Sequence, residues 1–292
     1  IMVSINDPLF SSQWHFALLG NIQRIWDEYT GAGVHVGVYD DGVQYTHPDL
    51  LANYDASLHF RYGNITYDPA PITLTGTDPD AHGTSVAGII AAAANNDLGG
   101  TGVAFGASIT GVNFLSDLRL QTDAMSHQAL LHAARFDVMS NSWGYNPYFE
   151  PFQNASIAGS TAALVIADYH NAVVVGRGGL GTIIVQAAGN EATNAQADGI
   201  NTARELISLA ALLPDGSAQS YTNYGANILV AAGAAAVTTD LVGSAGYNTA
   251  IGVAGNYQTD FGGTSAATPV VSGVVALMLD ANAGLGWRDV QE

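Results

Sequence analysis

The chain has 292 residues, of which 48% are hydrophobic and only 11% are charged, enough apolar material for one large core in a single domain. Its 25 acidic residues outnumber 7 basic residues, all arginine, and the formal net charge of −18 argues against nucleic acid and anionic membranes as partners. Cysteine is absent, which excludes disulfides and thiolate metal sites. The apolar runs are interrupted before about 18 residues, so we expect no transmembrane helix.

Short β-branched runs alternate with longer helical patterns along the chain. The expected strands cover 34–40, 108–115, 137–143 and 181–190, and the expected helices cover 82–96, 122–135, 160–173 and 267–283. This alternation is typical of an α/β fold with a mostly parallel sheet and helices on both faces. In such sheets, functional groups gather at the carboxyl ends of the strands. We therefore expect the site at that edge.

Three polar residues stand where expected strands end or expected helices begin. Asp40 ends the first strand in VYDDGV, His82 opens a helix in DAHGTSVAG, and Ser265 opens the last helix in GGTSAATP. Taken singly, Asp40 could be a turn residue, and His82 and Ser265 could be helix caps. Taken together, in the order Asp, His, Ser, they match one of the chain orders of the serine-protease triad.

With these residues in place, the sequence resembles the subtilisin-like serine proteases (peptidase family S8), and within them the kexin and furin branch. The resemblance rests on DDGVQYTHPDL, HGTSVAGIIAAAANN, SNSWG, GRGGLGTIIVQAAGN and GGTSAATP, and it covers most of the chain from Asp7 onward. It implies a subtilisin-like three-layer fold with a seven-stranded sheet, and endopeptidase activity in a secreted or periplasmic protein, which we expect to be prokaryotic. Residues 1–292 would form the catalytic domain. The β-sandwich P domain of kexin-type enzymes is not among them, and we expect further sequence downstream.

The three residues have defined roles in such an enzyme. A serine hydroxyl is a weak nucleophile at neutral pH, so His82 would take its proton, while Asp40 would orient the imidazole and stabilise its cation. The resemblance assigns the oxyanion to the amide of Asn190, in QAAGNE, and to the backbone N–H of Ser265. Two alternatives stay open: a catalytically silent scaffold that binds peptides, and an esterase or other acyl hydrolase.

Sequence motifs for nucleotide binding, for the α/β-hydrolase nucleophile and for zinc binding are incomplete. GRGGLG at 176–181 fits the dinucleotide fingerprint GxGxxG, but a strand follows it where that motif needs a helix. The nucleophile elbow GxSxG is incomplete, because Ala267 stands at its last glycine. The remaining histidines show no zinc-binding spacing. The sequence therefore indicates neither a nucleotide nor a zinc ion.

The resemblance implies one structural Ca²⁺ site. Its ligands would be carboxylates, an amide and main-chain carbonyls, from Asp7, Asp49, Ala93, Asn96, Leu98 and Gly100. Oxygen ligands of these kinds suit Ca²⁺, although HPDL and ANND could also be ordinary turns. A second calcium site of that branch is not expected, because Pro147 and Asn223 stand where it has acidic ligands.

The resemblance also implies a preference for Arg or Lys immediately before the scissile bond. Ser142, Trp143 and Gly144 in SNSWG would form pocket walls, and Asp198 in ADGINTA would supply an acidic floor for a guanidinium or ammonium group. Asp41 matches an acidic residue of the next subsite. The alternative is an apolar pocket in which Asp198 is a solvated turn residue.

Departures from the branch weaken this preference. Pro147 replaces one pocket acid, and Ser126 and Pro79 replace acids of more distant subsites, so we expect a trypsin-like or loosely dibasic specificity. The expected partners are protein and peptide substrates with basic residues, together with a propeptide, chaperone or proteinaceous inhibitor of the kind this family uses.

Overall fold

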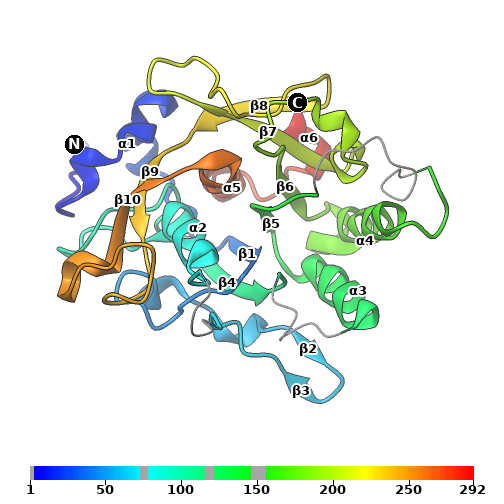
Figure 1. The fold of residues 1–292 in the computed structure, drawn as a ribbon, viewed down its shortest axis with the longest axis horizontal. Helices are drawn as coiled ribbons and strands as arrows, with labels where there is room; N and C mark the ends of the chain where they lie inside the picture. The colour runs from blue at the N-terminus through cyan, green and yellow to red at the C-terminus, as the bar shows by residue number, and fades with distance from the viewer. Residues whose placement is uncertain (1–2, 73–77, 116–121, 146–155) are drawn as a thin grey trace.

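A parallel sheet forms the centre of the computed structural model, which describes residues 3–72, 78–115, 122–145 and 156–292. The strand order is β4-β1-β5-β6-β7-β8, and helices cover both faces (Figure 1). Buried on both sides, most of these strands are nearly continuous apolar runs, which confirms the α/β prediction. The strands are β1 (His35–Asp40), β4 (Ser108–Asn113), β5 (Val138–Asn141), β6 (Ile183–Ala187), β7 (Leu206–Leu212) and β8 (Ile228–Gly233).

The sheet has six strands in the described part of the chain, where seven were expected. At the outer edge of β4, pairing is reduced to a single parallel bridge between Tyr54 and Ile109. Short 3₁₀ turns at Leu51–Asn53 and Ala56–Leu58 flank Tyr54, so the backbone is extended there too briefly to form a ladder. The expected seventh strand is therefore only one bridge.

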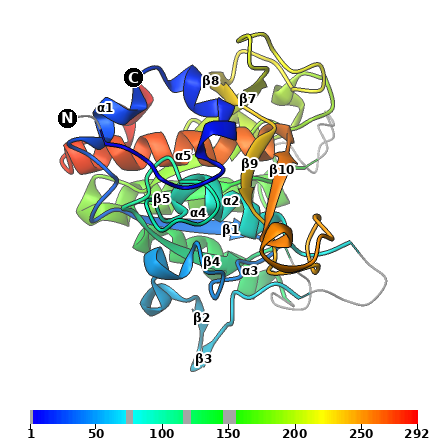
Figure 2. The same cartoon turned by 90° about the vertical axis from the view of Figure 1, so that its left-hand side faces the viewer.

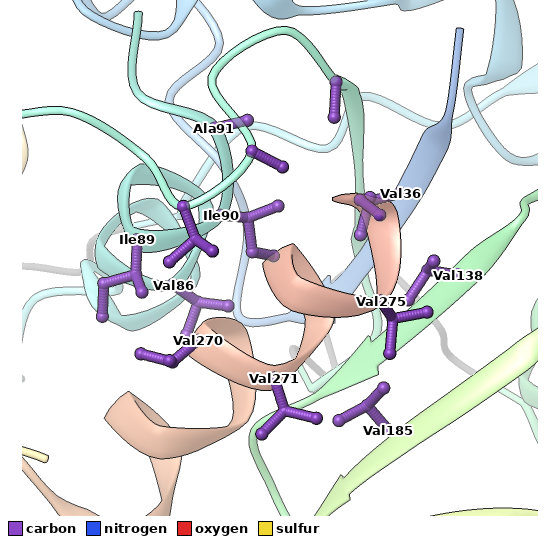
Figure 3. Packing of buried hydrophobic residues seen from close by; sticks show 14 of the residues in the cluster. Val36, Val86, Ile89, Ile90, Ala91, Val138, Val185, Val270, Val271 and Val275 are labelled. Atoms are coloured by element: carbon purple, nitrogen blue, oxygen red, sulfur yellow. The ribbon is translucent and has the colours of Figure 1, made fainter. Parts of the chain in front are cut away.

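Two buried helices cover the first face of the sheet. α2 (His82–Ala91) and α5 (Gly263–Ala281) pack against each other, α2 over β1 and α5 over β5 to β8. Figure 3 shows Val86 and Ile90 of α2 close to Val270 of α5, with Val275 above the strands. This core fixes the starts of the two helices relative to each other, and both helices begin at the edge of the sheet where β1 and β6 end.

The opposite face is covered by α3 (Asp123–His132) and α4 (Thr161–Val175). Both helices begin at a hydroxyl N-cap: Thr122 accepts from the Met125 N–H and Ser160 from the Ala163 N–H, each at 3.2 Å. Such caps satisfy N–H groups that have no partner within the helix. These two helices enclose a second apolar cluster, which places the sheet in the middle of three layers.

Smaller elements surround these layers. α1 (Ile22–Trp26) and α6 (Trp287–Gln291) lie near the two ends of the described chain, and the hairpin β2 (Arg61–Tyr62) and β3 (Ile65–Thr66) projects from the body (Figure 2). An antiparallel pair, β9 (Ala236–Thr239) and β10 (Tyr257–Phe261), lies beside α2. The strands β7 to β10 were not among those predicted.

α5 is long and apolar enough, by length and composition, to cross a membrane, with 19 residues and a mean hydropathy of 1.4. This differs from the expectation that apolar runs would be too short. In the structure, 72% of its most apolar window is buried inside the protein. A central core helix has the same composition, so this feature is weak evidence for a span.

Candidate active site

The end of β1 and the start of α2 bring Asp40 and His82 together. His82 Nδ1 and the fully buried Asp40 Oδ1 are hydrogen-bonded at 2.8 Å. Gly83 permits this contact, because a Cβ at that position would lie 2.7 Å from Asp40 Cβ. A carboxylate at Nδ1 places the imidazole proton there, so Nε2 is the nitrogen that can accept another. The pair has the arrangement of a general base and its orienting acid.

Asp41, next to this pair, caps the start of α2. Its carboxylate accepts hydrogen bonds from the backbone N–H of His82 at 3.1 Å and of Gly83 at 2.8 Å, which caps α2. Burial and the charge of Asp40 raise the pKa of Asp41 to about 7. Sequence reasoning gave Asp41 only a substrate-binding role and missed this cap.

Two carboxylates determine the charge of His82. Burial acts to lower the pKa of His82, but the charge of Asp40, its hydrogen bond and the charge of Asp41 outweigh burial. The pKa of His82 therefore lies above the usual 6.5. The site stabilises an imidazolium ion, which is the form a general base reaches after taking a proton.

Ser265 lies in the first turn of α5. Its Oγ donates to the carbonyl of Ser142 at 3.1 Å, and Ser142 Oγ donates to the carbonyl of Ser265 at 3.0 Å. Among the described residues, Ser265 and His82 are not joined by a hydrogen bond. Catalytic hydrogen bonds are often unformed without substrate, and rotation about the Cα–Cβ bond of Ser265 would release its hydroxyl.

Side-chain oxygens accept hydrogen bonds from the first two N–H groups of α5, whereas no side chain accepts one from the N–H of Ser265 within the described residues. Gly263 donates to the Tyr221 hydroxyl at 3.1 Å, and Thr264 donates to Asn190 Oδ1 at 2.8 Å. Because Thr264 supplies a backbone donor, the oxygen of the Asn190 amide is identified, and its NH₂ group makes no hydrogen bond to the described residues. The Asn190 NH₂ and the Ser265 N–H therefore remain as donors beside the hydroxyl. The part played by Tyr221 was missed, since nothing in SYTNY signals it.

Asp198 is buried close to Gly144. It is 2% exposed, and a Cβ on Gly144 would lie 3.5 Å from its Oδ2. The Ile200 N–H and the Asn201 amide each donate to Asp198 at 2.9 Å, yet burial still raises the pKa of Asp198. Trp143 stacks on Phe114 with ring centroids 5.1 Å apart. Pro147, which stands where the kexin and furin branch has a pocket acid, lies outside the described residues.

The residues expected to bind calcium also meet in the fold. Asn96 Nδ2 donates to Asp49 Oδ1 at 2.8 Å, and Asp7 accepts from the N–H groups of Asn95 and Asn96 at 2.9 and 3.1 Å. The other oxygen of Asp49 is buried with the Tyr257 hydroxyl as its neighbour, and burial raises the pKa of Asp49 to about 7. Within the described chain, no arginine pairs with either carboxylate. Two buried acids without a counter-charge suit a cation.

The loop after α2 carries carbonyls that suit the same cation. The carbonyl of Gly99 accepts from Leu9 N–H at 2.7 Å, whereas those of Ala93, Leu98 and Gly100 accept no hydrogen bond from described residues. These are the three carbonyls that the resemblance assigns as ligands. No cluster of three or more His, Cys, Asp or Glu side chains forms in the described chain, so a metal here would rely on such carbonyls. The donor set fits Ca²⁺, which takes six to eight oxygens.

Comparison with known proteins decides the family. The model of the subtilase family (Peptidase_S8) matches residues 31–292. This chain belongs to the subtilase family. The subtilase is 33% identical over 315 residues to neuroendocrine convertase 2 of Bos taurus, covering 100% of this chain and 46% of that protein. It is 33% identical over 301 residues to human furin, covering 98% of this chain and 35% of furin. The predicted relation to the kexin and furin branch is confirmed, and the subtilase spans less than half the length of these relatives.

Solved structures agree with this assignment. The serine protease of Aeromonas sobria, in its complex with the chaperone ORF2, superposes with a TM-score of 0.84 at 26% identity, over 100% of this subtilase and 57% of that chain. A cold-adapted subtilisin-like serine proteinase shares the fold, with a TM-score of 0.65 over 90% of this chain and 81% of that one, at 22% identity. The predicted subtilisin-like fold is confirmed, with six strands in its described sheet.

Proposed function

We propose that this subtilase is a serine endopeptidase that hydrolyses peptide bonds through an acyl-enzyme. The observation that carries the proposal is the 2.8 Å hydrogen bond between the buried Asp40 and His82. The helices α2 and α5 pack against each other, and His82 contacts Phe261, four residues before Ser265, with ring centroids 5.1 Å apart. A base held by a carboxylate beside a serine on a helix start is the constellation for acyl transfer.

The residues would act in the following order. His82 Nε2 takes the proton of Ser265 Oγ as this oxygen attacks the substrate carbonyl, and Asp40 stabilises the imidazolium. The Asn190 NH₂ and the Ser265 N–H stabilise the oxyanion. His82 then gives its proton to the leaving amine, the C–N bond breaks, and the acyl group stays on Ser265. Water, deprotonated by His82, releases the acid and restores the serine.

The two alternatives use less of this arrangement. A peptide-binding scaffold has no need for a carboxylate that raises the pKa of His82, nor for unpaired donors next to Ser265. An esterase would use the same groups, since ester hydrolysis follows the same acyl-transfer steps. The buried acid near Gly144 supports the peptidase, since Asp198 would pair with a basic side chain of a peptide substrate.

For specificity, we propose Arg or Lys immediately before the scissile bond. Asp198 supports this, because a buried carboxylate with a raised pKa gains most from a cationic partner. Asp41 is proposed to favour a second basic residue. Its two helix-capping bonds limit that contribution, which fits a loosely dibasic preference.

A structural Ca²⁺ is proposed between Asp7, Asp49 and the loop after α2. When bound, the ion would supply the positive charge that these carboxylates lack. Asp7 and Asp49 would hold it with their carboxylates and Asn96 with its amide oxygen, alongside the carbonyls of Ala93, Leu98 and Gly100. Because Asp7 precedes the core elements, this site would attach the start of the chain to α2.

Partners and location follow as further proposals. Protein and peptide substrates are expected, together with a propeptide, inhibitor or chaperone. Support for a chaperone comes from the Aeromonas sobria protease, whose structure was solved with one. We propose a secreted or periplasmic location, because the proposed oxygen-ligand Ca²⁺ site would be filled most readily where calcium reaches millimolar levels.

The proposal is tested by comparing a peptide with the corresponding ester in the wild type, in Ser265→Ala and in the surface control Ser217→Ala. We expect the wild type and the control to cleave both substrates, and Ser265→Ala to lose at least about 10⁴-fold in kcat. Turnover of the ester alone would favour the esterase. Failure of the folded wild type to cleave either substrate would favour the scaffold.

A further inference from the structure

A groove of about 310 Å³ lies outside the groups used so far. It is formed by the loop before β10 and by β10 itself. All five lining residues carry polar atoms: Tyr247, Asn248, Gln258, Thr259 and Asp260. Neither the triad nor the pocket at Asp198 includes any of them.

The position of β10 relates this groove to the reaction. The strand ends at Phe261, whose ring packs against His82, and the chain then continues through two glycines to Ser265. In Figure 1, β10 lies on one side of α2 and α5, and β5 and β6, which lead to Gly144 and Asn190, lie on the other. The groove therefore lies on the His82 side of the candidate active site.

The direction of the substrate follows from the chemistry. The side chain before the scissile bond would enter the pocket at Asp198, on the β5 and β6 side. The leaving amine must receive its proton from His82, so it lies on the His82 side. The residues after the scissile bond consequently extend past His82 toward Phe261 and β10, where the groove begins.

Hydrogen bonds hold the groove wall in place. The fully buried Asp240 accepts from the N–H of Tyr247 at 3.1 Å and of Asn248 at 2.6 Å. The Asn248 amide donates to the carbonyls of Ala254 and Tyr257 at 2.8 and 2.7 Å. The loop is thus tied both to β9 and to β10, so its exposed side chains are presented in a set geometry.

The chemistry of the groove suits a cation. Asp260 is exposed and makes no hydrogen bond or ion pair with the described residues. Tyr247 is 45% exposed and lies in the field of the acids Asp41, Asp40, Asp240 and Asp78. A guanidinium or ammonium group could pair with the Asp260 carboxylate while lying over the Tyr247 ring, whose face attracts cations.

We propose that this groove binds a basic side chain of the substrate within the first three residues after the scissile bond. The inference rests on the proposed peptidase function and extends it to the leaving-group side. The groove would then act with Asp198 to select substrates that are basic on both sides of the cleaved bond.

The test uses internally quenched peptides with a constant Arg before the scissile bond. Arg, Gln or Glu is placed at the first, second or third position after it, and kcat/KM is measured for the wild type and for Asp260→Asn. An Arg anilide, which has no residues after the scissile bond, is measured in parallel. Asp215→Asn, which removes an exposed acid in the turn after β7, is the matched control.

We expect Arg to exceed Gln by about 3- to 10-fold in kcat/KM at one of these positions, the range of an exposed ion pair with a cation–π contact. Asp260→Asn should bring this ratio near one and leave the anilide unchanged, while Asp215→Asn should keep the ratio. An equal rate for Arg and Gln in the wild type, or an unchanged ratio in Asp260→Asn, would overturn the inference. A wild type that fails on the anilide as well would overturn the proposed function and this inference with it.

Discussion

Asn190 accepts the backbone N–H of Thr264, the residue directly before Ser265, at 2.8 Å. The same amide oxygen accepts the Thr264 hydroxyl at 3.1 Å, and that hydroxyl oxygen accepts the Gly189 N–H at 3.2 Å. The loop after β6 and the start of α5 are thus held in one network. Ser265, the proposed nucleophile, and Asn190, the proposed oxyanion donor, are therefore positioned together.

Replacing Asn190 by Ala should lower kcat by about 10²- to 10³-fold with little change in KM, the cost established for such a donor in a subtilisin. The reason is that the NH₂ group would act on the oxyanion, which exists only in the transition state. Steady-state kinetics on an Arg peptide measures the effect. Asn194→Ala is the control, because the side chain of Asn194 caps the 3₁₀ turn Ala195–Ala197 and makes no hydrogen bond to Ser265 or His82. An unchanged kcat in Asn190→Ala would remove Asn190 from the mechanism.

Activity should depend on pH through His82. The neutral imidazole is the base, and the pKa of His82 is raised, so kcat/KM should fall as the pH drops through a value above 6.5. Asp41→Asn removes a negative charge that favours the imidazolium, which should move this acid limb to lower pH. The profile of kcat/KM between about pH 5 and 9 tests this. A limb that stays in place or moves upward in the variant would contradict the proposed influence of Asp41.

Asp198→Asn should weaken the preference for a basic residue before the scissile bond. The variant keeps the shape of the side chain but loses the charge, so kcat/KM for Arg relative to Leu should fall by about 10- to 100-fold. Matched peptides with Arg, Lys, Phe and Leu at that position give the ratio. If the wild type already cleaves the Leu or Phe peptide faster than the Arg peptide, Asp198 does not form a basic-residue pocket.

Chelation should destabilise the protein. In the absence of a cation, the folded-state pKa of Asp49 is about 7, above the unfolded value of about 3.9, so stability should be lost as the pH rises from 4 to 7. Bound Ca²⁺ should offset this loss, and at 100 times Kd it adds about 2.7 kcal/mol, which corresponds to about 4 °C in Tm for a chain of 292 residues. Melting curves with EDTA and with Ca²⁺ at pH 5 and 8 measure both effects. Asp49→Asn should abolish the response to Ca²⁺. Equal Tm values with and without EDTA at pH 8 would exclude the site.

Local patterns predicted the strands and helices that carry the site. The apolar runs ending at Asp40 and before Asn190, and the small residues after His82, are determined by burial in a parallel sheet, which local sequence records. The helix expected to run to residue 96 ends at Ala91, because Ala92 leaves the helical conformation, with φ −56° and ψ 138°, and the chain turns into the loop. The local sequence pattern does not predict that turn, since the loop is held by hydrogen bonds to Asp7 and Asp49, which are distant in sequence.

The contacts that sequence did not predict join residues far apart in the chain. Tyr221 reaches the Gly263 N–H, 42 positions away, and Asp41 caps a helix that starts 41 positions later. The reduction of the seventh strand to one bridge at Tyr54 likewise depends on how neighbouring turns pack at an edge. Tertiary packing decides these details, and they are invisible in one segment read alone.

Covalent labelling of Ser265 is the most direct test of the proposed Asp40, His82 and Ser265 triad. Folded wild type and His82→Ala should be treated with a fluorophosphonate at pH 8, and the modified residue identified by peptide mass spectrometry. We expect one adduct, on Ser265, in the wild type, and much slower labelling in His82→Ala, because the base is lost. No adduct on Ser265 in folded wild type, or equal labelling rates in the two proteins, would contradict the assignment of Asp40, His82 and Ser265 as a catalytic triad.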